Sequence, residues 1–551
     1  MKEKPWYRHY DDHIDPDLPI PPLLVSDIIT ANSQPEQVAL DYLGTQITFG
    51  ELDKLVQRMA NVFDQLGVKK GDPIGLHLPN IPQYVISYYA AMSLGAIVVN
   101  FNPMYTSHEL ISLIRQTGLK ILITFEGVLP VVEKVCQEVK IPFIIATGVS
   151  DFLADTPATS SVGLGLRKGW LHFSELLDKA TETAPPRVKI HPGDPAMIQF
   201  TGGTTGVPKG AVLTHANIIS AIIGCSQWGQ PVTQMTPPGE RVAICVMPLF
   251  HVLANVNCMG WSMFNCARLV LIPRFELESF MDMLETFEKI TFLPTVPTMI
   301  NAMINHPKAK QIKLDKRLDL LNSGGGPMPV DLVEKIKENG IYYVEGWGMS
   351  ETTAIGIGNP VMGLKKNGSI GIPLPGLDIR LMDLETGKTQ VAQGEPGELV
   401  VKGTFVMKEY WNSPEKTASE LKDGWLYTGD IAVMDEDGYL FIVDRKKDMI
   451  IAGGYNIYPR EIDEVLHQHP KVAEAISIGV PHEYRGETVK AYLVLEPGQT
   501  ATQEEIIEFC KERLAAYKIP KLIEFRDDLP KSAVGKTLRN VLRQQEADKR
   551  V

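Results

Sequence analysis

Residues 201–210, with the sequence TGGTTGVPKG, have the composition of a phosphate-binding loop. Glycine lets backbone N–H groups turn toward an anion without a Cβ clash. The hydroxyls of Thr201, Thr204 and Thr205 add further donors, and Lys209 adds a positive charge. An apolar run at 197–200 precedes the loop and suits a strand. Taken alone, this pattern predicts a phosphate-binding site and nothing more specific.

The loop is not a Walker A loop, in which glycine, lysine and then serine or threonine follow one another. Lys209 follows Pro208 and precedes Gly210. A second near-match at 535–537, Gly-Lys-Thr, has Pro530 where the motif requires its first glycine. The sequence therefore disfavours a P-loop nucleotidase.

Further segments carry residue types that take part in chemistry. They are MPLFH (247–251), NSGGGP (322–327), EGWGMSET (345–352), YTGD (427–430), DRKKD (444–448) and LPKSAVGK (529–536). Each has a purely structural explanation: a satisfied core histidine, a tight glycine turn, a packed tryptophan or a solvated lysine. Together with the loop at 201–210, their joint occurrence in this order, over some 340 residues, favours a functional explanation instead.

The spacing of apolar runs predicts the elements that position these segments. Strands at 74–78, 97–99, 121–124, 142–146 and 196–200 alternate with helices at 82–94 and 129–139. Such alternation favours a parallel sheet covered by helices. Residues 147–195 are rich in Ser, Thr, Gly and Pro and predict an irregular excursion.

The pattern of apolar runs and of Gly and Pro residues changes in the last third of the chain. Short strands between Gly and Pro predict a β-rich subdomain at about 368–443. The five consecutive charges at 444–448 are not expected in a core and predict a hinge. Beyond them, helices at 459–467 and 502–514 and strands at 472–479 and 489–495 form an α+β pattern.

The predicted fold class is therefore α/β and α+β. A large N-terminal domain of helix-covered sheets spans 1–446 and includes the β-rich subdomain. A small, mobile α+β C-terminal domain spans 447–551.

Length, composition and charge limit the class of protein. The chain has 551 residues, 44% apolar and 22% charged, which suits a globular protein of roughly three or four domain-sized units. Its formal net charge of −12 would repel a polyanion, so we expect no nucleic-acid partner. A local basic site can still bind a phosphorylated ligand.

The cysteines and apolar stretches indicate a cytoplasmic protein. None of the six cysteines falls at C-x-x-C spacing, which favours reduced thiols over a disulfide framework or zinc site. The N-terminus lacks the apolar core of a signal peptide. Stretches 80–107 and 242–267 contain no Asp, Glu, Lys or Arg, but Pro and Asn interrupt them. We therefore expect buried core there and no transmembrane segment.

The motifs together resemble the adenylate-forming superfamily of acyl-CoA synthetases, firefly-type luciferases and peptide-synthetase adenylation domains. The resemblance runs from about Ile47 to Arg539 and is greatest to bacterial long-chain fatty acid–CoA ligases. That narrower likeness rests on KPW (4–6), GWGMSE (346–351), DRKKDMI (444–450) and GGYNIYP (453–459).

The resemblance implies a two-step ligase. A fatty acid, expected to be long-chain, reacts with ATP to give acyl-AMP and pyrophosphate, and coenzyme A then takes the acyl group and releases AMP. ATP and coenzyme A are the implied co-substrates and Mg²⁺ the cofactor. The implied nucleotide-binding residues are Thr201, Gly202, Gly203, Thr204, Thr205, Gly206, Lys209, Gly324, Gly325, Gly326, Pro327, Glu345, Gly346, Trp347, Gly348, Met349, Ser350, Asp430, Arg445 and Lys536.

Individual roles also follow from the resemblance. Residues 201–209 would wrap the β- and γ-phosphates, and Glu351 would hold Mg²⁺ with Thr201 nearby. The glycines at 324–326 would lie against the adenine, on which Trp347 stacks. Asp430 would accept from the ribose hydroxyls, and Arg445 would support the ribose or phosphate side.

The remaining roles concern the acid and coenzyme A. Lys536 would bridge the carboxylate and the α-phosphate, and His251 would orient the acid. Lys447 would be the hinge that removes Lys536 and brings Gly453 and Gly454 to the pantetheine channel. The implied acyl pocket is bordered by Val252, Val256, Gly260 and Trp261.

Three positions depart from the usual family pattern. Ser350 stands where threonine is usual, Trp347 where tyrosine is more frequent, and Ile451 where some relatives carry lysine. A hydroxyl and an aromatic ring are kept at the first two. A nucleotide contact from the third is not expected.

Alternative functions remain at this point. An aryl or medium-chain acid–CoA ligase uses the same chemistry, as does a stand-alone adenylation enzyme that loads a carrier protein. The chain ends about fifteen residues past Lys536, so we expect no fused carrier domain. A non-catalytic binder is disfavoured because Lys536, Glu351, Asp430 and Arg445 are all present. A monomer or a homodimer, and a peripheral membrane contact, stay open.

Overall fold

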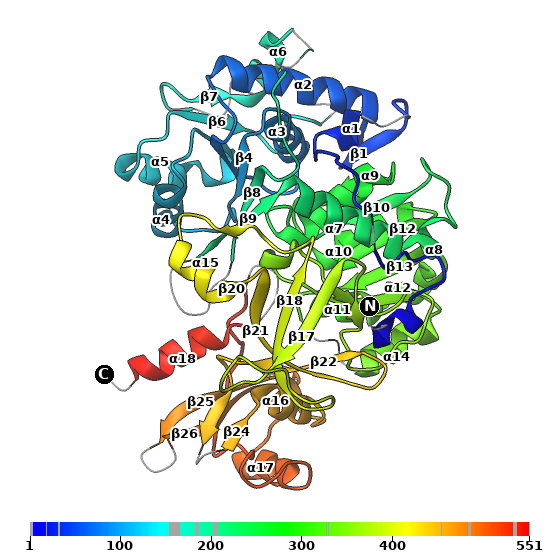
Figure 1. Ribbon diagram of the computed structural model, residues 1–551, viewed down its shortest axis with the longest axis vertical. Coiled ribbons are helices and arrows are strands. Elements are labelled where there is room, and N and C mark those ends of the chain that lie inside the picture. Colours follow the sequence, from blue (N-terminus) through cyan, green and yellow to red (C-terminus); the bar gives the residue numbers. More distant parts are fainter. Residues whose placement is uncertain are drawn as a thin grey trace. The chain divides into compact units, whose positions relative to one another are not determined.

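The computed structural model describes residues 4–17, 19–30, 34–153, 166–181, 184, 187–201, 208–326, 328, 330–452, 455–482, 486–532 and 537–549. These residues form two compact units (Figure 1). The first holds the described residues up to 201, together with 208–378 and 402–424. The second holds 379–401 and the described residues from 425 onward.

The first sheet of the first unit runs in the order β16-β15-β14-β13-β12-β10-β11-β1-β2. Its parallel strands are β1 (Val38–Tyr42), β11 (Arg268–Leu271), β10 (Val242–Cys245), β12 (Ile290–Thr295), β13 (Leu318–Ser323) and β14 (Tyr342–Trp347). Antiparallel strands at its edges are β2 (Thr45–Thr48), β15 (Ile357–Gly358) and β16 (Ile372–Pro373).

The second sheet of this unit runs in the order β19-β9-β8-β4-β3-β5-β6-β7. Its parallel strands are β8 (Pro195–Phe200), β4 (Ile97–Asn100), β3 (Pro73–His77), β5 (Ile121–Phe125), β6 (Phe143–Thr147) and β7 (Leu171–His172). The strands β9 (Gly210–Thr214) and β19 (Glu409–Tyr410) join it antiparallel. The predicted alternation of strands and helices is confirmed.

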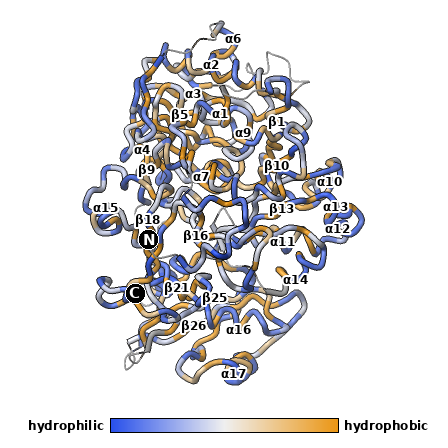
Figure 2. The backbone as a smooth tube through the Cα atoms, turned by 45° about the vertical axis from the view of Figure 1, so that its right-hand side comes forward, coloured by the Kyte–Doolittle hydropathy of each residue, from blue (hydrophilic) through white to orange (hydrophobic). Residues whose placement is uncertain are grey.

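Two helices of the first unit are apolar on nearly every side and largely buried. They are α3 (Pro82–Ser93) and α7 (His215–Trp228). A helix that is hydrophobic all round is typical of the interior of a large protein. Figure 2 shows hydrophobic segments around α3 and β5. By contrast, α2 (Phe49–Gln65) is amphipathic and begins at a capping box between Thr48 and Glu51.

Other helices cover the sheets or connect the strands of this unit. They are α1 (Asp27–Thr30), α4 (Ser107–Thr117), α5 (Leu129–Glu138), α6 (Phe173–Lys179), α8 (Gln230–Thr233), α9 (Trp261–Phe264), α10 (Leu277–Thr286), α11 (Pro297–Ile304), α12 (Lys308–Gln311), α13 (Leu314–Arg317), α14 (Val330–Glu338) and α15 (Pro414–Glu420). The strand β7 and helix α6 lie inside the predicted irregular excursion, so part of that stretch is regular.

The uncharged stretch 242–267 contains an unusual helix. We expected a strand, a turn and a helix there, and the structure has β10, a turn and then the π-helix η4 (Leu253–Gly260), which runs into α9. Every residue of η4 is buried. π-Helices are rare and frequently occur at functional sites.

Both uncharged stretches are largely buried, as predicted, although Met104 and Phe264 near their ends are exposed. Across the described ranges, none of the helices combines the length and apolar character needed to cross a bilayer.

The second unit contains a small antiparallel sheet. Its strands include β17 (Leu377–Met382), β18 (Gly397–Gly403), β21 (Trp425–Met434) and β22 (Leu440–Arg445). These strands lie in the part of the chain where the sequence predicted short strands.

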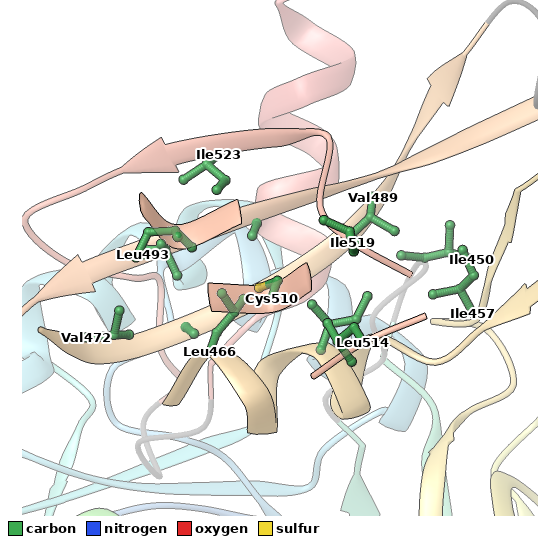
Figure 3. Packing of buried hydrophobic residues seen from close by; sticks show 14 of the residues in the cluster. Ile450, Ile457, Leu466, Val472, Val489, Leu493, Cys510, Leu514, Ile519 and Ile523 are labelled. Carbon is green, nitrogen blue, oxygen red and sulfur yellow. The ribbon is translucent and has the colours of Figure 1, made fainter. Parts of the chain in front are cut away.

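The rest of the second unit is an α+β fold. Its sheet runs β24 (Tyr455–Ile457), β23 (Ile450–Ala452), β26 (Gly486–Leu495) and β25 (Val472–His482), with β27 (Leu522–Phe525) parallel to β26. Helices α16 (Pro459–His467), α17 (Gln503–Lys511) and α18 (Arg539–Asp548) accompany it. Side chains of its strands and of α16 and α17 form an apolar core, which includes Leu466, Leu493 and Cys510 (Figure 3). Leu542 of α18 belongs to a second cluster with Ile478 and Tyr492.

The charged run 444–448 differs from our expectation. Asp444 and Asp448 are only 2% and 6% exposed. The carboxylate of Asp444 accepts from the backbone N–H of Arg460 at 2.9 Å, and Asp448 pairs with Arg543 at 2.7 Å. Burying a charge is costly unless it is paired and hydrogen-bonded, and these partners supply that compensation.

The fold class is confirmed: helix-covered sheets form a large N-terminal part, and a smaller α+β part follows. The hinge at Lys447 and the division into 1–446 and 447–551 stay predictions.

A buried histidine at the start of α7 makes the fold sensitive to acid. The backbone N–H of Val25 donates to Nδ1 of His215 at 3.3 Å, which requires an unprotonated nitrogen. Burial lowers the pKa of His215 from 6.5 to about 4. The unfolded chain therefore binds the proton first, and stability falls as pH drops below 6.5. At pH 5 this ring alone should cost about 2 kcal/mol relative to neutral pH.

His215→Asn tests this effect, because the amide oxygen can accept from Val25 without titrating. Chemical denaturation at pH 7, 6 and 5 should show a flatter loss of unfolding free energy in this variant. His108, exposed on α4, provides the matched control His108→Asn. Equal pH slopes in wild type and His215→Asn would contradict the prediction.

Candidate active site

Several predicted site residues follow the parallel strands of the first sheet at one edge. Register aligns Thr295 of β12 with Ser323 of β13, and Ser323 with Glu345 of β14. The glycine run 324–326 therefore begins beside the end of β14. In open α/β sheets, ligands bind outside the carboxyl ends of the strands, and this edge has that position.

The glycine run makes close backbone approaches at this edge. Gly325 has a φ of +79°, a conformation that L side chains rarely adopt. The N–H of Gly324 donates to the carbonyl of Thr295 at 3.2 Å. A Cβ on Gly324 would lie 3.5 Å from Leu253, so the run lies against the first residue of η4.

Glu345 supports the turn that follows the glycine run. Its side chain is buried, and Oε1 accepts from the backbone N–H of Met328 at 3.3 Å. Pro327 lies outside the described residues. In the described structure, Glu345 thus binds protein backbone at the predicted nucleotide edge.

The segment after β14 is tightly constrained. A Cβ on Gly348 would lie 2.1 Å from the carbonyl oxygen of Ala354, so only glycine fits. The ring of Trp347 packs against Gly356, where an added Cβ would lie 3.0 Å away. Thr353 and Ala354 have φ values of +54° and +76°. Such strained backbone is often found at functional sites.

These constraints position the short helix η5 (Ser350–Thr352), which carries Glu351. The N–H of Met349 donates to the hydroxyl of Thr352 at 2.9 Å, and the N–H of Met407 donates to the carbonyl of Glu351 at 2.8 Å. The side chain of Glu351 is buried. Ser350 begins the same helix.

A polar network connects Glu351 with Lys209. The hydroxyl of Tyr410 lies 2.9 Å from Oε1 of Glu351 and 2.6 Å from Oε2 of Glu420. The other oxygen of Glu420 pairs with the ammonium of Lys209. Burial and the two carboxylates raise the pKa of Tyr410 well above its ordinary value, so its hydroxyl stays protonated.

The loop 201–209 closes between β8 and β9. The N–H of Thr201 donates to the carbonyl of Lys209 at 2.9 Å, and Phe200 pairs with Gly210. Thr201 and Lys209 are therefore held at the base of the loop. Its glycines Gly202, Gly203 and Gly206, with Thr204 and Thr205, lie outside the described residues.

His251 lies in the turn between β10 and η4. The N–H of Leu253 donates to its Nδ1 at 3.3 Å, so the neutral ring carries its proton on Nε2. Buried side chains fix this turn: Tyr84 donates to the carbonyl of Leu249 at 2.8 Å, and Gln199 donates to that of Phe250 at 3.0 Å. The turn is thus held rigidly beside the glycine run.

The predicted acyl-pocket residues are part of a dense core. Val252, Val256 and Trp261 are at most 2% exposed. A Cβ on Gly260 would lie 2.6 Å from Ile222, and the rings of Trp261 and Phe292 are 4.8 Å apart. Their role toward an acid stays a prediction.

In the second unit, Asp430 and Arg445 face each other. They are register partners on β21 and β22, and Nε of Arg445 lies 2.5 Å from Oδ1 of Asp430. Asp430 is buried, and its N–H donates to the hydroxyl of Thr428. The carbonyl of Lys447 accepts from Arg543 at 3.3 Å. Lys536, Gly453 and Gly454 lie outside the described residues.

Comparison with known proteins decides the family. Residues 29–411 match the AMP-binding enzyme family, and residues 461–536 match the AMP-binding enzyme C-terminal domain. The chain belongs to the AMP-binding enzyme family. The resemblance to adenylate-forming enzymes is thereby confirmed.

Relatives of this AMP-binding enzyme include CoA ligases for different acids. It is 38% identical to the long-chain-fatty-acid–CoA ligase of Bacillus subtilis (strain 168), and the match covers 100% of this chain and 99% of the relative. It is 33% identical to feruloyl-CoA synthase of Amycolatopsis sp., covering 94% of this chain and 97% of that protein. These relatives place the AMP-binding enzyme in the acyl-CoA ligase family.

A solved structure supports the same fold. ATP-bound MatB from Rhodopseudomonas palustris has a TM-score of 0.84 and 29% identity to the AMP-binding enzyme, covering 95% of this chain and 99% of MatB.

Proposed function

We propose that this protein is an ATP-dependent fatty acid–CoA ligase that prefers long-chain acids. It would convert the acid to acyl-AMP with release of pyrophosphate and then form acyl-CoA and AMP. The observation that carries this proposal is the full-length similarity to a long-chain-fatty-acid–CoA ligase.

The first step brings two anions together, so it requires positive charge and fixed donors where negative charge gathers. Lys209, at the base of the loop, would contact the β- and γ-phosphates together with the loop residues. Lys536 would bridge the carboxylate and the α-phosphate. An ammonium on a flexible stem suits a group that arrives and then leaves.

Glu351 fits the requirements of a Mg²⁺ ligand. Its buried carboxylate supplies the oxygen that this ion prefers. Among the described residues, His, Cys, Asp and Glu do not gather in groups of three or more that could hold a metal. A divalent ion would thus depend on Glu351, Thr201, phosphate oxygens and water. Mg²⁺ is typically bound through few carboxylates in this way, and its charge would offset that of the triphosphate.

The nucleoside would lie along the glycine run and Trp347, whose ring offers a stacking surface. Asp430 would accept from the ribose hydroxyls. Arg445 holds one oxygen of that carboxylate and so fixes its orientation. His251, with its proton on Nε2, would donate to the incoming acid.

In the second step, the thiol of coenzyme A attacks the acyl-adenylate. A free thiol has a pKa of about 8.5, so some thiolate exists without a dedicated base. The proposed hinge at Lys447 would remove Lys536 and bring Gly453 and Gly454 to the pantetheine.

The substrate assignment is tested by mass spectrometry of products from ATP, coenzyme A and an acid mixture. The mixture should contain fatty acids of graded length together with benzoic and ferulic acids. Long-chain acyl-CoA is the expected main product. The similarity to feruloyl-CoA synthase supports an aryl acid ligase as second candidate, and aroyl-CoA as the main product would favour it. AMP release without coenzyme A dependence would favour a carrier-loading enzyme.

Replacing the hinge residue by proline tests the two-step rotation. Lys447→Pro fixes φ near −65° and removes an N–H, so we expect thioester formation to fall about tenfold or more while adenylation changes little. Lys447→Ala, which keeps the backbone freedom, is the matched control. Parallel loss of both half-reactions in Lys447→Pro would count against a hinge at this position.

A further inference from the structure

Tyr410 lies where three parts of the chain meet: the start of β9, the helix η5, and the segment formed by β19 and α15. β19, which ends at Tyr410, pairs with β9, the strand that follows Lys209. The helix α15 ends at Glu420 (Figure 1). The helix η5 presents Glu351. The phenol thus lies between the proposed phosphate lysine and the proposed metal ligand, although neither Tyr410 nor Glu420 has a role in the proposed function.

The hydroxyl of Tyr410 has one proton and two carboxylate neighbours. It lies 2.9 Å from Glu351 and 2.6 Å from Glu420, so it donates to one of them at a time. Glu420 already has a cation, because Lys209 pairs with its other oxygen. Glu351 is the more deeply buried carboxylate, with 6% exposure. The phenol oxygen is nearer to Glu420, but the ammonium of Lys209 already compensates that carboxylate, which leaves the phenolic proton available to Glu351 in this state.

In the proposed function, nucleotide binding changes the partner of each carboxylate, Glu420 and Glu351. Triphosphate attracts Lys209 away from Glu420, and a divalent ion at Glu351 replaces the phenolic proton there. The Tyr410 O–H can then rotate to Glu420, which has lost its ammonium. Each carboxylate keeps a positive or hydrogen-bonding partner in both states, so neither pays the cost of a desolvated, unpaired charge.

We propose that Tyr410 and Glu420 are positioning residues that act as a hydrogen-bond switch. Glu420 holds Lys209 before nucleotide binds, and Tyr410 compensates Glu420 once Lys209 has moved to the triphosphate. This inference rests on the proposed function, in which Lys209 contacts phosphate and Glu351 holds the metal ion.

A double-mutant cycle tests the switch. Equilibrium binding of ATP in the presence of Mg²⁺ is measured by calorimetry for the full-length chain. Tyr410→Phe keeps the buried ring and removes the hydroxyl, so Glu420 has no donor in the bound state. ATP affinity should fall about tenfold. Glu420→Gln frees Lys209 from its counter-ion, and ATP affinity should rise about two- to fivefold.

The double variant is the decisive measurement. With glutamine at position 420 there is no charge to compensate, so adding Tyr410→Phe should change ATP affinity less than twofold. Such non-additivity is typical of residues that act as one unit. An equal loss from Tyr410→Phe in both backgrounds would indicate a merely structural ring and overturn the proposal.

Matched controls separate local packing from the switch. Tyr89→Phe removes a buried hydroxyl from α3, and Glu415→Gln neutralises an exposed carboxylate on α15. Both should bind ATP as the wild type does. If the wild type itself fails to bind ATP, the proposed function is wrong. If it binds ATP and the cycle is additive, only the switch is wrong.

Discussion

Lys536→Ala is expected to abolish formation of the acyl-adenylate and to spare thioester formation from preformed acyl-AMP. The lysine would offset the repulsion between the carboxylate and the α-phosphate, which is present only in the first step. Removing one such donor typically costs about 100- to 1000-fold in rate. Pyrophosphate release measures the first half-reaction, and acyl-CoA formed from synthetic acyl-AMP measures the second.

Lys531→Ala is the matched control on the same segment. Lys531 pairs with Glu474 at 2.6 Å and is partly exposed, and such pairs contribute little to stability. Both half-reactions should therefore proceed at wild-type rates in this variant. Equal loss of the two half-reactions in Lys536→Ala would refute the assigned role of Lys536.

Glu351→Gln is expected to slow adenylation about a hundredfold or more and to raise the Mg²⁺ concentration required for half-maximal rate. Glutamine has the same size and can still accept from Tyr410, so the fold should be retained. The lost charge would weaken binding of the divalent ion. Rates of pyrophosphate release across a Mg²⁺ titration provide the measurement, with melting temperature as the check on folding.

Glu338→Gln, on the exposed side of α14, is the control for this experiment. It should leave the Mg²⁺ titration unchanged. If Glu351→Gln reached half-maximal rate at the wild-type Mg²⁺ concentration, Glu351 would not be the metal ligand.

Local patterns predicted the elements well. The helix 459–467 was placed correctly because Pro459 fixes its first turn and its apolar residues, including Ile462 and Leu466, recur at helical spacing. The alternation of strands and helices in the first 320 residues was also correct. The π-helix η4 was not predicted, because its sequence has the same apolar character as an ordinary buried helix.

Contacts between residues that lie far apart in the sequence could not be predicted from local patterns. The sequence suggested that Asp444 and Asp448 are solvated because their partners lie further along the chain. The backbone N–H of Arg460 donates to Asp444, and Arg543, 95 residues after Asp448, supplies the charge beside Asp448. Tyr410 and Glu420 were missed for the same reason: they contact Glu351 and Lys209, which lie 59 and 211 residues away. The predicted site residues at the sheet edge, by contrast, follow the neighbouring parallel strands β12, β13 and β14. The parallel order of these strands brings the residues together.

The arginines of α18 make the last turns of the chain a structural requirement. Arg539 pairs with Asp463, whose pKa burial raises to about 6, and Arg543 pairs with Asp448. A protease cut or a premature stop before Arg539 would leave two buried acids without their cations. The shortened protein would then lose the integrity of its second unit, so its C-terminal tail cannot be trimmed as a disposable extension.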